Sequence, residues 1–194
     1  MGFDVIHGCQ ATFRALLEAT SYPGRCLDLS LAVASLATES PLPPSAFLIA
    51  ICLIDVETTF YVEGDRKAER ETFLSRLCGA EPARLGDADF VFVPGAKSRL
   101  AELVLGARAG DLVDPHKGAT IVAAVEALSS PGRLRLRGPG IDGERDVAIA
   151  RDPEWISART KKNEEFPLGV DFFFFDAAER VMALPRTTLV SEVP

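Results

Sequence analysis

Four consecutive phenylalanines, Phe172 to Phe175, constrain the fold of this chain more than any other feature of its sequence. Side chains alternate between the two faces of a β-strand, so a strand made of four phenylalanines needs apolar cover on both faces. The centre of a sheet with helices on both sides provides that cover. The run therefore predicts an α/β fold in which helices flank the sheet.

Hydrophobic spacing and turn residues predict the elements around that strand. The predicted helices cover residues 9–20, 65–79, 100–106 and 152–163. The predicted strands cover residues 58–62, 89–93, 119–128, 133–137, 170–175 and 181–184, and residues 27–37 read as a strand followed by a loop. Together the elements predict a mixed sheet flanked by helices. No repeat or low-complexity tract interrupts the pattern, so we expect a single domain over residues 1–194.

Two of these expectations concern local detail. Residues 119–128 and 133–137 are expected to pair as a hairpin, because Ser-Ser-Pro-Gly between them is typical of a turn. The helix over residues 65–79 is expected to have Asp65 as its N-cap and Gly79 just beyond its end. Its residues Phe73, Leu74 and Leu77 are expected to face the core.

The longest uninterrupted apolar run, residues 46–54, is about half as long as a membrane span requires. Periodicity does not separate a buried helix from a buried strand here, and the isoleucines favour a strand. The chain begins Met-Gly-Phe-Asp, without the basic segment and apolar stretch of a secretory signal. We therefore expect a cytoplasmic protein that does not enter membranes.

Charge and metal-binding residue types narrow the classes of function. The formal net charge is −7, which argues against a protein that wraps a nucleic-acid backbone. Arginines outnumber lysines 16 to 5, which reflects either genomic base composition or planar recognition of phosphate and carboxylate groups. The four cysteines are scattered without a Cys-x-x-Cys pair and only two histidines occur, so no metal site is expected.

Residues 138–143 match the Gly-x-Gly-x-x-Gly string of dinucleotide-binding folds. In those folds the string follows a buried strand and opens a long helix. Here the preceding strand alternates arginine with leucine, and Pro153 comes too soon for such a helix. An ordinary loop is therefore expected.

The same alternating strand places Arg133, Arg135 and Arg137 on one face, roughly 7 Å apart between neighbours. This row is either a site for a polyphosphate or acidic partner, or the solvated outer face of an edge hairpin. His116 shares a loop over residues 114–118 with a carboxylate and an ammonium group. That combination suits acid–base chemistry or simply a soluble loop.

An arginine and two hydroxyl residues, Arg186, Thr187 and Thr188, follow the last predicted strand directly. They form either an anion site, with Pro185 fixing the chain direction, or a strand exit with Arg186 paired internally. An anion site predicts that Arg186→Ala impairs function with little change in melting temperature. An internal brace predicts a large loss of stability instead.

Several sequence blocks occur in the order found in one known family. They are Phe13-Arg14-Ala15-Leu16-Leu17 with Ser21-Tyr22-Pro23-Gly24, Pro115-x-x-Gly118-Ala119-Thr120, Leu134-x-Leu136-x-Gly138-Pro139-Gly140-Ile141, and Phe166-Pro167-Leu168-Gly169-Val170-Asp171 with Ala183-Leu184-Pro185-Arg186-Thr187-Thr188. In these blocks the chain resembles the PhnH family, a subunit of the carbon–phosphorus lyase machinery. The resemblance spans residues 13–188, although residues 27–112 contribute little to it.

The resemblance implies a fold similar to pyridoxal-phosphate (PLP)-dependent transferases, in reduced form and without PLP. It also favours a helix over residues 46–54. It implies a homodimer that associates with PhnG, PhnI, PhnJ and PhnK. With PhnG, PhnI and PhnL, such a subunit is required for ribose 1-methylphosphonate 5-triphosphate synthase activity. In that reaction an alkylphosphonate displaces adenine from MgATP, so MgATP is a substrate of the complex.

Displacing adenine from a triphosphate-bearing ribose needs cationic donors and a group that protonates or holds the leaving base. This chain has arginines but no clear acid–base pair, so we expect the catalytic groups mainly on another subunit, and its own catalytic residues stay unknown. The alternatives are a stand-alone phosphonate- or nucleotide-binding enzyme, and an interaction scaffold with an exposed strand edge. The candidate ligand-binding residues are Arg14, Ser21, Arg186, Thr187 and Thr188, with His116 and Arg135 as secondary candidates.

Overall fold

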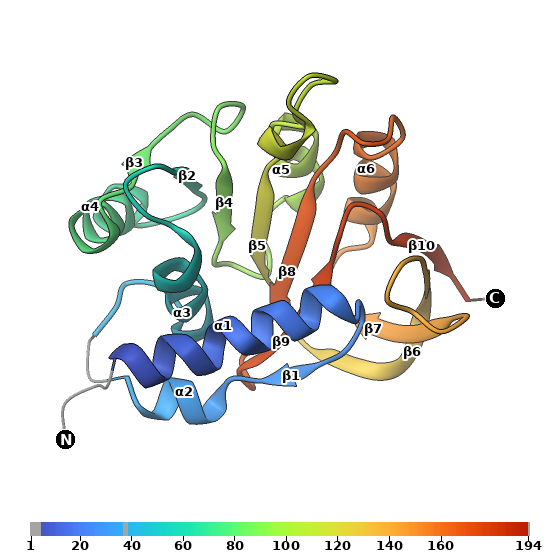
Figure 1. The fold of residues 1–194 in the computed structure, drawn as a ribbon, viewed down its shortest axis with the longest axis horizontal. Helices are drawn as coiled ribbons and strands as arrows, with labels where there is room; N and C mark the ends of the chain where they lie inside the picture. Colours follow the sequence, from blue (N-terminus) through green and yellow to red (C-terminus); the bar gives the residue numbers. More distant parts are fainter. Residues whose placement is uncertain (1–4, 37–38, 194) are drawn as a thin grey trace.

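A computed structural model of the chain describes residues 5–36 and 39–193 (Figure 1). The helices are α1 (Val5–Ser21), α2 (Ser30–Ala34), α3 (Pro44–Leu53), α4 (Lys67–Cys78), α5 (Leu100–Gly106) and α6 (Glu154–Lys162), with a 3-10 turn at Pro115–Lys117. The strands are β1 (Leu27–Asp28), β2 (Thr59–Val62), β3 (Glu81–Pro82), β4 (Phe90–Val93), β5 (Thr120–Ala124), β6 (Leu128–Arg137), β7 (Arg145–Ile149), β8 (Asp171–Phe175), β9 (Arg180–Leu184) and β10 (Leu189–Glu192). None of the helices in these ranges is long and apolar enough to cross a membrane. The sequence start used above, residues 1–4, lies outside the described residues.

The strands form two sheets. The large sheet has seven strands in the order β1-β9-β8-β5-β4-β2-β3, and the small sheet has three in the order β10-β6-β7. In the large sheet β9 is antiparallel to both of its neighbours, whereas the strands from β8 through β5, β4 and β2 to β3 are parallel. The prediction of an α/β fold with a mixed sheet and flanking helices is confirmed.

The four phenylalanines form most of β8, which lies inside the large sheet between β5 and β9. Phe172 and Phe174 face a core shared with α5, α6 and the small sheet, where their ring centroids lie 5.8 and 5.0 Å from that of Trp155. Phe173 and Phe175 face the opposite core, which α1, α3 and α4 complete. Each fully buried phenylalanine stabilises the fold by about 1.5–3 kcal/mol, so the run requires both layers.

Residues 46–54 lie in α3 up to Leu53, and the strand favoured by their isoleucines is wrong. Every residue from Ser45 to Ala50 is buried, so this helix is apolar on all sides. Pro44 occupies the first turn, where its missing N–H and fixed φ favour a helix start. Burial on every side thus outweighs the weak β preference of isoleucine, as the family resemblance implied.

The expected hairpin between residues 119–128 and 133–137 is wrong. β5 is a central strand of the large sheet, parallel to β4 and β8. The residues expected to form the turn lie inside β6, which pairs with β7 across residues 138–144. Between Ser129 and Leu134 the register shifts, so the proline and glycine are accommodated as a strand irregularity instead of a turn. The Gly-x-Gly-x-x-Gly string is the loop between β6 and β7, as expected.

Two smaller expectations also fail. The residue before α4 is Arg66, not Asp65, and Leu77 is 49% exposed, although Gly79 ends the helix at φ +75° as expected. The segment 27–37 forms the short β1 and then helix α2 in place of a loop, with residue 37 outside the described residues.

The buried carboxylate of Asp176 links the turn between β8 and β9 to the small sheet by hydrogen bonds. Asp176 accepts hydrogen bonds from the backbone N–H groups of Leu128, Ala178 and Arg180, and from the Arg180 guanidinium at 2.8 Å. Burial alone would raise the pKa of Asp176, but these hydrogen bonds outweigh burial and hold the pKa below its ordinary value. The ionised carboxylate therefore ties the large sheet to the start of β6.

Candidate functional site

Three of the family-like sequence blocks meet at the end of α1. The β6–β7 loop approaches so closely that a Cβ on Gly140 would lie 2.1 Å from the carbonyl oxygen of Ser21. On the same loop, a Cβ on Gly138 would lie 2.9 Å from the carbonyl oxygen of Thr187. The side chains of Ser21 and Thr187 are exposed. The structure thus places these two candidate residues in one tightly packed region, where their backbone atoms contact the glycines of the β6–β7 loop.

The β6–β7 loop offers a matched pair of substitutions for testing this region. Gly140 has φ +80° and Gly143 has φ +68°, but no atom lies within 4 Å of a Cβ added at Gly143. We expect Gly143→Ala to lower the free energy of unfolding by about 1 kcal/mol, the penalty of a positive φ alone. Gly140→Ala should lower the free energy of unfolding by at least twice as much, because the added Cβ also collides with Ser21 and Pro23. Urea unfolding of both variants measures the difference; equal losses would contradict the close packing.

The closing block and the Pro115–Gly118 loop converge on Arg186. Its Nε and Nη2 donate to Oδ2 of Asp171 at 3.0 and 2.5 Å, and Nη1 donates to the carbonyl oxygens of Pro115 at 2.8 Å and Pro167 at 3.3 Å. The backbone N–H of Arg186 donates to Oδ1 of Asp171 at 2.6 Å. Gly118 permits this approach, since a Cβ there would lie 2.6 Å from Nη1. The geometry favours the internal brace over the anion site.

The remaining candidates lie apart from that brace. Arg14 is exposed on α1, and His116 is exposed in the 3-10 turn whose neighbouring carbonyls hold Arg186. Arg135 donates to both carboxylate oxygens of Asp146 at 2.8 and 3.0 Å, and also forms an ion pair with Glu144. Its strand, β6, is central in the small sheet, so the expected edge position is wrong. The arginine row is therefore partly neutralised by neighbouring carboxylates.

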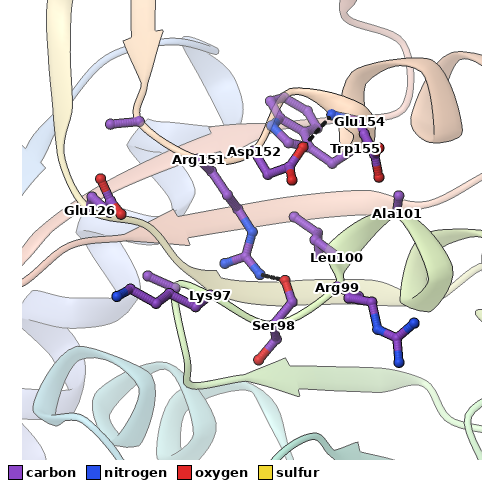
Figure 2. A pocket seen from close by; sticks show the side chains of 12 residues that line it. Lys97, Ser98, Arg99, Leu100, Ala101, Glu126, Arg151, Asp152, Glu154 and Trp155 are labelled. Atoms are coloured by element: carbon purple, nitrogen blue, oxygen red, sulfur yellow. Dashed lines mark hydrogen bonds between the residues drawn. The ribbon is translucent and has the colours of Figure 1, made fainter.

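A cleft of ≈ 390 Å³ lies at the carboxyl ends of the parallel strands β4 and β5, the side of an open α/β sheet where ligands commonly bind. Its wall comes from three segments: residues 96–101 after β4, Glu126 after β5, and the segment from the end of β7 into α6, which contributes Ala150, Arg151, Asp152, Glu154 and Trp155. Figure 2 shows the Arg151 side chain reaching across it from the α6 side toward Ser98. None of the residues expected from the sequence lines this cleft.

Arg151 holds the walls of the cleft together. Its Nη2 donates to the carbonyl oxygen of Ser98 at 2.7 Å, and its Nη1 donates to the carbonyl oxygen of Ala124 at the end of β5. Burial lowers the pKa of Arg151 to about 10, so the guanidinium still carries its charge at neutral pH. Two N–H donors of this wall are buried and lack a partner among the described residues: Nε of Arg151 and Nε1 of Trp155.

The cleft therefore combines unpartnered donors with acidic and basic side chains. Glu126, Asp152 and Glu154 carry negative charge, and Lys97, Arg99 and Arg151 carry positive charge. Such a balanced lining suits a polar ligand with both acceptor and donor groups better than a simple anion. Sequence reasoning missed this site because its residues come from loops after three separate strands, and only the fold brings them together.

Comparisons with known proteins agree on one family. The family model described as "Bacterial phosphonate metabolism protein (PhnH)" matches residues 2–191. A C-P lyase subunit protein, HtxG, of Stutzerimonas stutzeri is 34% identical over 183 residues, which cover 94% of this chain and 85% of that protein. The alpha-D-ribose 1-methylphosphonate 5-triphosphate synthase subunit PhnH of Rhizobium meliloti (strain 1021) is 29% identical over 194 residues, with 95% and 91% coverage.

Proposed function

Because this chain belongs to the PhnH family, we propose that it is a subunit of the carbon–phosphorus lyase machinery. In this role it is required, with PhnG, PhnI and PhnL, for ribose 1-methylphosphonate 5-triphosphate synthase activity. The observation that carries the proposal is the match to a relative named as a subunit of that synthase, which extends over 95% of this chain. The assembly is a cytoplasmic complex that also contains PhnJ and PhnK, and this chain enters it as a homodimer.

In the proposed reaction an oxygen of the alkylphosphonate bonds to the anomeric carbon of the ATP ribose. The bond from that carbon to adenine breaks, and adenine leaves with the electron pair and takes up a proton. Within this complex, the cleft in Figure 2 is where this chain meets substrate. There the guanidinium of Arg151 and the exposed ammonium of Lys97 supply positive charge for acceptor atoms of the substrate. The groups that move the proton belong mainly to a partner subunit.

We further propose that the fold is a reduced form of the PLP-dependent transferase fold that works without PLP. The single antiparallel strand β9, second from one edge of a seven-stranded sheet, supports the resemblance. The surroundings of three of the five lysines support this proposal. Lys97 lines the cleft but is exposed, Lys117 pairs with Asp114, and Nζ of Lys162 donates to the carbonyl oxygen of Leu105.

One observation favours a second function, that of an interaction scaffold. β10 is an edge strand of the small sheet, with β6 on one side only, and its backbone groups are available for a partner strand. By contrast, the engagement of Arg186 with Asp171 and nearby carbonyls weighs against a stand-alone enzyme that uses this arginine on substrate.

The proposal is tested by genetic replacement in a bacterium that lacks its own family member. We expect this chain to restore growth on methylphosphonate as the sole phosphorus source, because the missing subunit is replaced. Lys97→Met, which removes an exposed positive charge from the cleft, should reduce that growth although the protein still accumulates. Growth on inorganic phosphate is the control. Failure to restore growth while the chain co-purifies with the complex would contradict the proposal.

A further inference from the structure

A second pocket, of ≈ 550 Å³, is lined by residues of α6, of β10 and of the segments next to them, and it is separate from the cleft described above. Figure 1 shows where α6 and β10 lie in the fold. The wall of this pocket includes Arg159, Lys161, Asn163 and Glu164 from α6 and the residues after it, together with Arg186 and Thr188 from the segment between β9 and β10. Two of these, Arg186 and Thr188, belong to the closing sequence block. Arg159 was not singled out by the sequence.

Arg159 and Thr188, which both line this pocket, carry polar groups that make no hydrogen bond. Arg159 is 3% exposed and Thr188 is 1% exposed, yet Nε of Arg159 and Oγ1 of Thr188 have no hydrogen-bond partner in the described part of the chain. Both residues are anchored to one oxygen: Nη2 of Arg159 and the backbone N–H of Thr188 donate to the carbonyl oxygen of Pro185, at 2.7 and 2.9 Å. The Arg159 side chain and the backbone of Thr188 therefore meet at this carbonyl.

The charge of Arg159 is only partly balanced by the residues around it, because the nearby carboxylate of Asp171 raises its pKa less than burial lowers it. No carboxylate of the described residues forms an ion pair with this guanidinium, and the nearby Asp171 is already bound by Arg186. Burial lowers the pKa of Arg159 to about 10, which leaves it charged at neutral pH. Lys161 and Glu164 at the rim carry opposite charges, and the carbonyl end of α6 contributes only a partial negative charge. A buried cation without a counter-charge is costly, and an anionic ligand would offset that cost.

We propose that this pocket binds a small tetrahedral oxyanion of the phosphate class through the guanidinium of Arg159 and the hydroxyl of Thr188. Guanidinium groups bind phosphate oxygens with directional, charge-assisted hydrogen bonds. The two residues come from different elements, α6 and the segment before β10, so an anion bound by both would link these two segments. The proposal concerns the isolated chain and does not depend on the synthase role.

The test is calorimetric titration of the purified chain with inorganic phosphate at constant ionic strength, with methylphosphonate and acetate as parallel arms. We expect saturable phosphate binding that Thr188→Val weakens about tenfold, the loss of one hydrogen bond to a charged group. The matched control is Thr160→Val. Thr160 lines the same pocket, but its hydroxyl already donates to the carbonyl oxygen of Ile156 at 2.9 Å, so binding should change less than twofold.

Three results would overturn the site: no saturable phosphate binding, an equal loss in Thr160→Val, or acetate binding as tight as phosphate. Tighter binding of methylphosphonate than of phosphate would support the site and assign its ligand to organophosphonates. Arg159→Met should abolish binding, and a melting curve of this variant checks its fold. If that variant does not fold, the nearly isosteric Thr188→Val still decides the outcome.

Discussion

Replacing Arg186 by alanine is expected to lower the free energy of unfolding by roughly 3 kcal/mol, a large part of the stability of a domain this size. The Arg186 side chain is 15% exposed, and its guanidinium binds Asp171 together with the carbonyl oxygens of Pro115 and Pro167. Its loss leaves a half-buried carboxylate without a counter-charge and the loops at Pro115 and Pro167 without their common partner. Partial solvation of Asp171 keeps the loss at the lower end of the range for buried pairs.

The melting temperature should fall by roughly 6–12 °C, since each kcal/mol shifts a chain of this length by about 2–4 °C. The control is Arg84→Ala, because Arg84 pairs with Asp87 at the surface with 90% of its side chain exposed. That variant should lose less than about 0.5 kcal/mol. An unchanged melting temperature of Arg186→Ala, combined with loss of growth on phosphonate, would contradict the internal brace and support the anion site that the sequence also allowed.

The sequence predicts the large sheet well where one residue pattern has one structural solution. The four phenylalanines of β8 require cover on both faces, and the paired strands at residues 170–175 and 181–184 follow from local spacing. It fails at the small sheet, because Pro131-Gly132 is typical of a turn, but the chain accommodates it as an irregularity inside β6. That choice depends on β7, whose pairing partner cannot be read from local sequence.

The candidate sites show the same limit. Polar residues in the family-like blocks are recognisable in the sequence. In the structure, however, Arg186 binds loop carbonyl oxygens, and Ser21 and Thr187 make close backbone contacts with the β6–β7 loop. An arginine that binds a ligand and one that stabilises the fold have the same sequence pattern. Only the hydrogen-bond partners of the guanidinium distinguish the two roles. Arg151 and Arg159 carry no motif at all; their unpartnered buried donors become visible only in three dimensions.

We propose that this chain is a synthase subunit that is active only together with its partner subunits. The most direct test of this proposal is adenine release from MgATP and methylphosphonate, measured by chromatography in mixtures of purified subunits. We expect rapid release when this chain is combined with PhnG, PhnI and PhnL, and at least a hundredfold slower release, on the order of 3 kcal/mol in the barrier, when it is omitted or present alone. Equal release without this chain, or release by this chain alone, would contradict the account.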